Sequence, residues 1–127
     1  MGKVLIIDDE RTAVNWIYCD VVHARNPINA IKLLRLDVKW DVIMFDHDLG
    51  KDPEGNHYNV LDVVDFMNRR AYLQEPIEVK RILVHSMNPA GADNIVRGLE
   101  RFYGEIRELR RIPLPSTLVK LDHISVL

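Results

Sequence analysis

The stretch Val4-Leu5-Ile6-Ile7-Asp8-Asp9 decides the fold class of this chain. Its first four residues form a continuous apolar run in which three side chains are β-branched. Such a run is typical of a strand that is buried on both faces, as in a parallel sheet. The two aspartates end the run, so they place carboxylates at the carboxyl end of this predicted strand.

Similar apolar runs recur along the chain, and segments with helical spacing separate them. Further strands are predicted over residues 21–24, 41–45, 79–84 and 106–112. Helices are predicted to begin at Pro27 and to span about 59–73 and 92–102, with a short helix over 12–18 that Asp9 caps. The alternation predicts a flavodoxin-like three-layer α/β sandwich with helices on both faces. Its centre is a five-stranded parallel sheet with strand order 2-1-3-4-5.

Length and charge limit what the chain is expected to do. With 127 residues it is the size of one domain, and its net charge of −2 gives no bulk attraction to DNA or to a membrane. No apolar run reaches the length of a membrane span, Met1 runs directly into a strand pattern without a signal peptide, and Cys19 is the single cysteine. We therefore expect a cytoplasmic protein.

Residues 1–112 are predicted to form the domain, and Pro113 and Pro115 separate off a C-terminal tail over 113–127. Three alternatives stay open for this tail: a last strand, a final helix, or an arm that docks on a second copy or a partner protein.

Three polar clusters directly follow three of the predicted strands. Ligands of open α/β sheets bind outside the carboxyl ends of the strands, near the point where the strand order reverses. The three strands are neighbours in the order 2-1-3-4-5, so we expect the clusters to share one crevice. The clusters are Asp8-Asp9 after the first strand, Asp46-His47-Asp48 after the third, and His85-Ser86 with Asn88 after the fourth.

The carboxylates in this crevice predict a metal site. Four carboxylates that lie close together repel one another unless a cation is present. Hard oxygen ligands suit Mg²⁺ or Mn²⁺, and magnesium usually completes its shell with waters and phosphate oxygens of a substrate. The predicted ligands are Asp8, Asp9, Asp46 and Asp48. The cluster therefore predicts a phosphate-bearing ligand as well as a metal.

His47 and His85 add proton transfer, because histidine changes its charge near neutral pH. Ser86 and Asn88 are suited to hydrogen-bond phosphate oxygens, together with the helix N-terminus after Gly91. Plainer interpretations stay open for each cluster. The Asp8-Asp9 pair also suits a helix cap, the segment after the third strand suits a polar turn, and His85 suits a satisfied core histidine.

The remaining histidines and a basic run near the C-terminal tail are predicted to lie outside the site. His23 and His57 are interpreted as surface or loop residues, and His123 in the tail as structural. The basic run Arg107, Arg110 and Arg111 favours a charge guard on a strand edge, with an RNA-backbone contact as the alternative.

The residues that follow the predicted strands resemble those of a known protein family. Asp8-Asp9, Asp46 and Ser86 resemble the receiver domain of response regulators, in which the aspartates hold Mg²⁺ and the third-strand aspartate accepts a phosphoryl group. By this match Asp46 takes the acceptor position and Ser86 the switch hydroxyl position. Receivers usually carry a lysine and a proline after the fifth strand, whereas residues 109–113 read Leu-Arg-Arg-Ile-Pro and contain no lysine.

A narrower group shares more of these residues. The segments Phe45-Asp46-His47-Asp48-Leu49-Gly50 and His85-Ser86-Met87-Asn88-Pro89 are similar to the cyclic-phosphate-processing receiver domains of bacteria and phages, over about residues 3–112. The resemblance implies processing of cyclic phosphates on RNA ends or nucleotides. Two hypotheses follow. One is a metal-dependent phosphoesterase in which Arg11 joins Ser86 and Asn88 in holding phosphate oxygens. The other is a non-catalytic or phosphorylatable regulatory module.

Overall fold

Strand β1 (Gly2–Ile7) lies inside a five-stranded parallel sheet. β3 (Cys19–Ala24) pairs with it on one side and β4 (Trp40–Phe45) on the other. β5 (Val79–Val84) and β6 (Glu108–Arg111) extend the sheet beyond β4. The order β3-β1-β4-β5-β6 reads 2-1-3-4-5 when the strands of this sheet alone are counted, so the predicted α/β class and strand order are confirmed.

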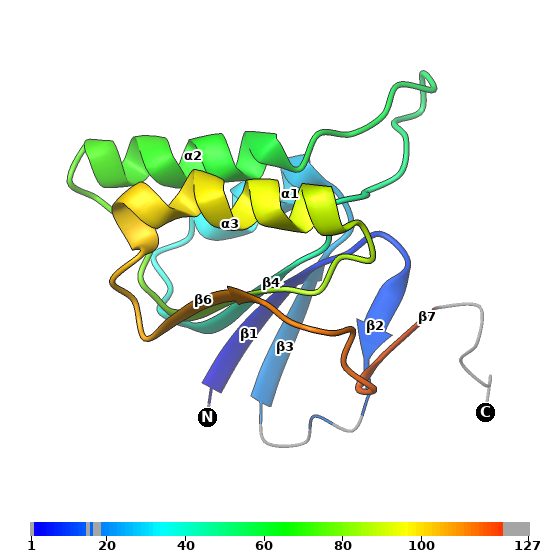
Figure 1. Ribbon diagram of the computed structural model, residues 1–127, viewed down its shortest axis with the longest axis horizontal. Coiled ribbons are helices and arrows are strands. Elements are labelled where there is room, and N and C mark those ends of the chain that lie inside the picture. Colours follow the sequence, from blue (N-terminus) through cyan, green and yellow to red (C-terminus); the bar gives the residue numbers. More distant parts are fainter. Residues whose placement is uncertain (1, 15, 17–18, 121–127) are drawn as a thin grey trace.

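Three helices cover one face of this sheet in the computed structural model, which describes residues 2–14, 16 and 19–120. They are α1 (Pro27–Leu34), α2 (Leu61–Tyr72) and α3 (Pro89–Tyr103), and all three lie on the same side of the sheet (Figure 1). Buried side chains from each helix join one apolar core with β1, β4 and β5. Within the described residues, no helix is long and apolar enough to cross a membrane.

A small second sheet covers the opposite face. β2 (Arg11–Ala13) pairs antiparallel with β7 (Leu118–Lys120), which comes from the predicted tail. Side chains that alternate with those facing the helices form a second core here. This core consists of Val4, Ile6, Met44 and Leu118. In the part of the chain that the structure describes, the third layer is therefore this small sheet, and the predicted helices on both faces are not observed.

The short helix predicted over residues 12–18 is wrong where the structure describes that segment; residues 15, 17 and 18 lie outside the description. The cause lies in the turn that precedes it. Asp8 accepts backbone hydrogen bonds through Oδ1, from the N–H groups of Glu10 and Arg11 at 2.9 Å each. This turn leads the chain into β2, and a hydrogen bond of 2.8 Å from Val14 N–H to the Thr117 carbonyl continues its pairing with the tail.

Two asparagine–proline pairs begin α1 and α3. The side chain of Asn26 accepts a hydrogen bond of 2.9 Å from Asn29 N–H, and that of Asn88 accepts one of 3.0 Å from Gly91 N–H. Proline at the first helical position is already set for helical geometry and lacks an N–H that would go unpaired. α3 therefore begins at Pro89, earlier than predicted, and Gly91 lies in its first turn.

Candidate functional site

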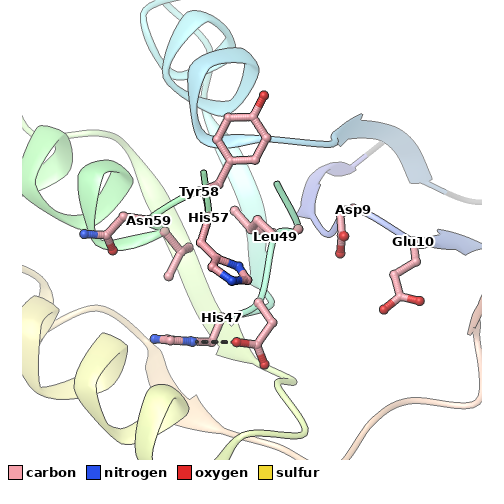
Figure 2. A pocket seen from close by; sticks show the side chains of 10 residues that line it. Asp9, Glu10, His47, Leu49, His57, Tyr58 and Asn59 are labelled. Atoms are coloured by element: carbon pink, nitrogen blue, oxygen red, sulfur yellow. Dashed lines mark hydrogen bonds and ion pairs between the residues drawn. The ribbon is translucent and has the colours of Figure 1, made fainter. Parts of the chain in front are cut away.

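A cavity of about 490 Å³ opens beside the carboxyl ends of β1 and β4 (Figure 2). Its lining comes from the turn after β1, the segment after β4, and the loop that leads to α2. The polar residues around it include Asp9, Glu10, His47, Asp48, His57 and Tyr58. The cavity lies where an open parallel sheet places its ligands, because the strand ends meet at this edge.

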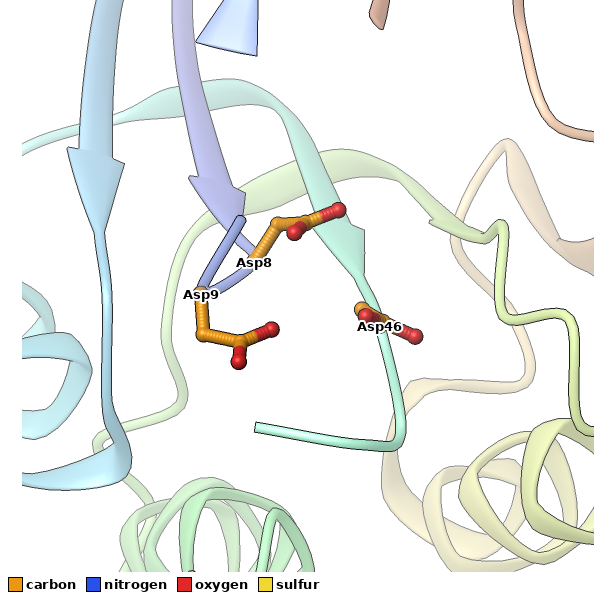
Figure 3. Close-up of side chains that lie close together, drawn as sticks. All are labelled: Asp8, Asp9 and Asp46. Atoms are coloured by element: carbon orange, nitrogen blue, oxygen red, sulfur yellow. The ribbon is translucent and has the colours of Figure 1, made fainter. Parts of the chain in front are cut away.

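An acidic group forms one side of this edge (Figure 3). Asp8 and Asp9 follow β1, Asp46 follows β4, and each offers a carboxylate oxygen within 4.8 Å of the other two. The Asp8 side chain is 0% exposed and Asp46 is 4% exposed, whereas Asp9 reaches the cavity. The structure thus brings together three of the four predicted metal ligands. It places the fourth, Asp48, on the exposed side of the cavity.

Arg11 lies against this acidic group and is 8% exposed. Its Nη1 atom is 3.4 Å from Asp8 Oδ2 and 3.6 Å from Asp46 Oδ2, so one guanidinium faces both buried carboxylates. Arg25 fixes the backbone here, because it donates hydrogen bonds to the carbonyl oxygens of Asp8 and Arg11. β2 therefore places the positively charged Arg11 side chain beside the acidic group. The sequence predicted Arg11 as a phosphate-binding residue.

His85 lies on the inner side of the acidic group and is 0% exposed. Its Nε2 atom is 2.9 Å from Asp8 Oδ2, and its buried Nδ1 atom has no hydrogen-bond partner among the described residues. Burial raises the pKa of Asp8, but hydrogen bonds from His85 and from backbone N–H groups outweigh it, so the pKa is lowered overall. This contact suits a role in orienting Asp8 better than the proton-transfer role predicted from the sequence.

The other two carboxyl groups hold protons more tightly than usual. Burial, followed by the negative charge of Asp8, raises the pKa of Asp46, although Arg11, His85 and Ser86 oppose this. Burial and the neighbouring acids raise the pKa of Asp9 to about 6. The Oδ1 atom of Asp9 is buried without a hydrogen-bond partner in the described residues. Three hard oxygen donors and an unpartnered carboxylate oxygen fit a small divalent cation.

His47 forms a pair with Asp48 at the far side of the cavity. The Nδ1 atom of His47 is 3.2 Å from Asp48 Oδ1 (dashed in Figure 2). The ring also lies against the first turn of α3, where a Cβ atom on Gly91 would come within 2.4 Å of its Cγ atom. Glycine at this position therefore leaves the space that the His47 ring occupies.

Ser86 and Asn88 connect the acidic group to the start of α3. Ser86 is buried and is one of the groups that lower the pKa of Asp46, while its Oγ atom accepts a hydrogen bond of 3.1 Å from Asn88 N–H. Because the Oδ1 atom of Asn88 caps α3, the amide NH₂ is the part of this side chain that is suited to a phosphate oxygen.

The arrangement of these residues agrees with a family comparison. The model of the cyclic-phosphate processing receiver domain matches residues 3–101. This chain belongs to that family. Searches of curated proteins and of solved structures gave no match. The matched range of this receiver domain includes the acidic group, the His47–Asp48 pair and the segment from His85 to Asn88.

Sequence reasoning missed three features of this receiver domain. His57, interpreted as a surface residue, lines the cavity. Gly50 has a φ of +72°, and a Cβ atom there would lie 2.8 Å from Asp9 Oδ2, so glycine allows the loop to pass beside the acidic group. Gly91 makes room for His47. The Asn88-Pro89 pair was a signal for Gly91, because it marks the first turn of α3, but no local signal marked His57.

Proposed function

We propose that this receiver domain is a divalent-metal-dependent phosphoesterase that opens cyclic phosphates on RNA ends or nucleotides. The observation that carries the proposal is the shared cavity, in which the His47–Asp48 pair and Asp9 of the acidic group line the same space. The family's description, cyclic-phosphate processing, supports the substrate class.

Asp8, Asp9 and Asp46 are the residues that would hold Mg²⁺ or Mn²⁺. A bound divalent cation supplies positive charge to the phosphate oxygens and makes a water molecule more acidic. His85 keeps Asp8 ionised and oriented through its hydrogen bond of 2.9 Å. Asp48, predicted as a fourth ligand, is instead assigned to His47 on the basis of their contact.

His47 is proposed to take the proton of the attacking water. With Nδ1 bonded to Asp48, the Nε2 atom of the ring is the proton acceptor. The carboxylate also stabilises the imidazolium ion that forms. Arg11, Ser86 and Asn88 would bind phosphate oxygens, and the Arg11 guanidinium is already desolvated, which strengthens its attraction for an anion.

A second candidate function is a phosphorylatable receiver module. The position of Asp46 after β4, with the Ser86 hydroxyl among the groups that lower its pKa, favours it. In this function Asp46 accepts a phosphoryl group and no ester is hydrolysed. The two candidates differ in what happens to Asp46, because a phosphoesterase uses it without modifying it.

The test uses the whole chain with Mn²⁺ or Mg²⁺ and a panel of phosphate esters. The panel contains RNA with a 2′,3′-cyclic end, cyclic mononucleotides and cyclic dinucleotides. We expect turnover of at least one ester, and a loss of at least 100-fold in Asp46→Asn. The matched control is Asp65→Asn, because Asp65 is an exposed carboxylate on α2. No turnover of any ester, with acetyl phosphate labelling Asp46 in a mass spectrum, would instead support the second candidate.

A further inference from the structure

Opening a cyclic phosphate requires a proton donor as well as a base. Water attacks phosphorus and gives up a proton, and the ring oxygen that leaves must gain one. An alkoxide of a ribose is a poor leaving group without that proton. The proposed function assigns the base to His47 and leaves the donor unassigned.

His85 is poorly placed to be this donor. It is 0% exposed, its Nε2 atom is engaged by Asp8 Oδ2 at 2.9 Å, and its Nδ1 atom is buried. A general acid must come within hydrogen-bond distance of the leaving oxygen, either directly or through one water. A substrate cannot meet this condition with His85 unless the acidic group is taken apart.

His57 is an imidazole that a substrate in the cavity can reach. It is exposed and lines the cavity together with Asp9 and His47. Figure 2 shows the His57 side chain together with those of Leu49 and His47, which line the same cavity. A phosphate bound beside Asp9 would therefore have one imidazole on the wall after β4 and a second on the loop before α2.

Hydrogen bonds within the loop that carries His57 set the conformation of its backbone. Asp52 N–H donates to the Asn56 carbonyl at 2.8 Å, and Asp52 Oδ1 accepts from the N–H groups of Glu54 and Asn56 at 2.9 Å each. Lys51 and His57 then form an antiparallel bridge. These contacts hold the backbone of His57 at the cavity rim, which reduces the entropy that a catalytic side chain loses when substrate binds.

We propose that His57 is the general acid of the reaction, a role that rests on the proposed phosphoesterase function. The bond from the water oxygen to phosphorus forms while the bond from phosphorus to the leaving ribose oxygen breaks. The water proton passes to His47, and the His57 proton passes to the leaving oxygen. The product is a phosphomonoester, and solvent exchange restores both imidazoles because both side chains reach water.

The test compares two leaving groups. The probes are 2′,3′-cyclic adenosine monophosphate, which releases an alkoxide, and bis(p-nitrophenyl) phosphate, which releases a phenolate that needs no proton. We expect His57→Gln to lower turnover of the cyclic nucleotide by about 100-fold or more and turnover of the nitrophenyl ester by less than about threefold. We expect His47→Gln to lower both, because the base is needed for either ester.

Lys51→Gln is the matched control, since Lys51 is an exposed residue of the same loop and does not line the cavity. It should leave both rates unchanged, and calorimetry should give the same Mn²⁺ affinity for all three variants. An active wild-type protein whose His57→Gln variant keeps its rate, or loses both rates equally, would overturn the role of His57 alone. A wild-type protein that turns over neither ester would overturn the phosphoesterase function and this role with it.

Discussion

Asp9 is the carboxylate that connects the buried acidic group with the cavity. Burial comes first among the causes that raise its pKa to about 6, and the negative charges of Glu10, Asp8 and Asp46 add to it. An unfolded chain has the ordinary value of 3.8 for this group. The folded protein therefore binds the Asp9 proton more tightly than the unfolded chain does.

The sign of the resulting pH dependence follows from linkage. A group with a raised pKa contributes stability that is fully present below pH 3.8 and is lost as the pH rises through about 6. In EDTA, we expect Asp9→Asn to be more stable than the wild type at pH 7, with the difference shrinking as the pH falls to 4. Urea unfolding at several pH values measures this, with Asp65→Asn as the control. A difference that stays constant with pH would contradict it.

The sequence could predict which residues belong to this site only where they directly follow a recognisable strand. Asp8, Asp9 and Asp46 come directly after apolar runs, so their shared edge could be deduced. The different surroundings of His85 and His57 could not be deduced. His85 is buried against Asp8, which follows β1, whereas His57 lies in a hydrogen-bonded loop. Burial of this kind depends on contacts between distant segments, and the spacing of apolar residues along the sequence does not reveal such contacts.

At the scale of elements, the small sheet of β2 and β7 replaces the helices expected on the second face. The pattern of residues 12–18 is equally compatible with a short helix. β2 forms as a strand because residues 118–120 pair with it. The long parallel strands were predictable because each is an apolar run of its own, whereas pairing between the two ends of the described chain has no local signature. The same small sheet holds Arg11 at the acidic group.

We expect Leu118→Ala to reveal how much the small sheet contributes to stability. Leu118 is 4% exposed and packs in the second core, so its truncation should lower the free energy of unfolding by about 2–4 kcal/mol. Leu114→Ala is the control, because Leu114 is an exposed residue of the same tail and should lose less than about 1 kcal/mol. Chemical denaturation measures both. Equal losses would show that β7 adds no specific packing.

At the scale of the whole molecule, the net charge of −2 conceals a concentrated negative site. Three carboxylates lie together with one arginine, while other acids are paired on the surface. On the edge strand β6, Glu108 contacts both Arg81 and Arg110, while the charge guard inferred from Arg107, Arg110 and Arg111 stays a prediction.

A divalent cation should therefore stabilise the folded molecule as a whole. At a concentration a hundred times its dissociation constant, Mn²⁺ would add about 2.7 kcal/mol, which raises the melting temperature by roughly 8 °C for a domain of this size. Asp46→Asn should abolish most of this increase, and EDTA should reverse it in the wild type. Scanning calorimetry measures the shift. A shift of equal size in Asp46→Asn would place the cation elsewhere.

The pairing of β2 with β7 also has a consequence for the timing of protein synthesis. β1 and β2 leave the ribosome before β7 does, yet the backbone partner of Arg11 is Lys120 of β7. A nascent chain that has not reached Leu118 has no third layer over Val4, Ile6 and Met44. Arg11 is then unsupported beside the acidic group, so this pocket acquires its final charge balance only after β7 has been synthesised.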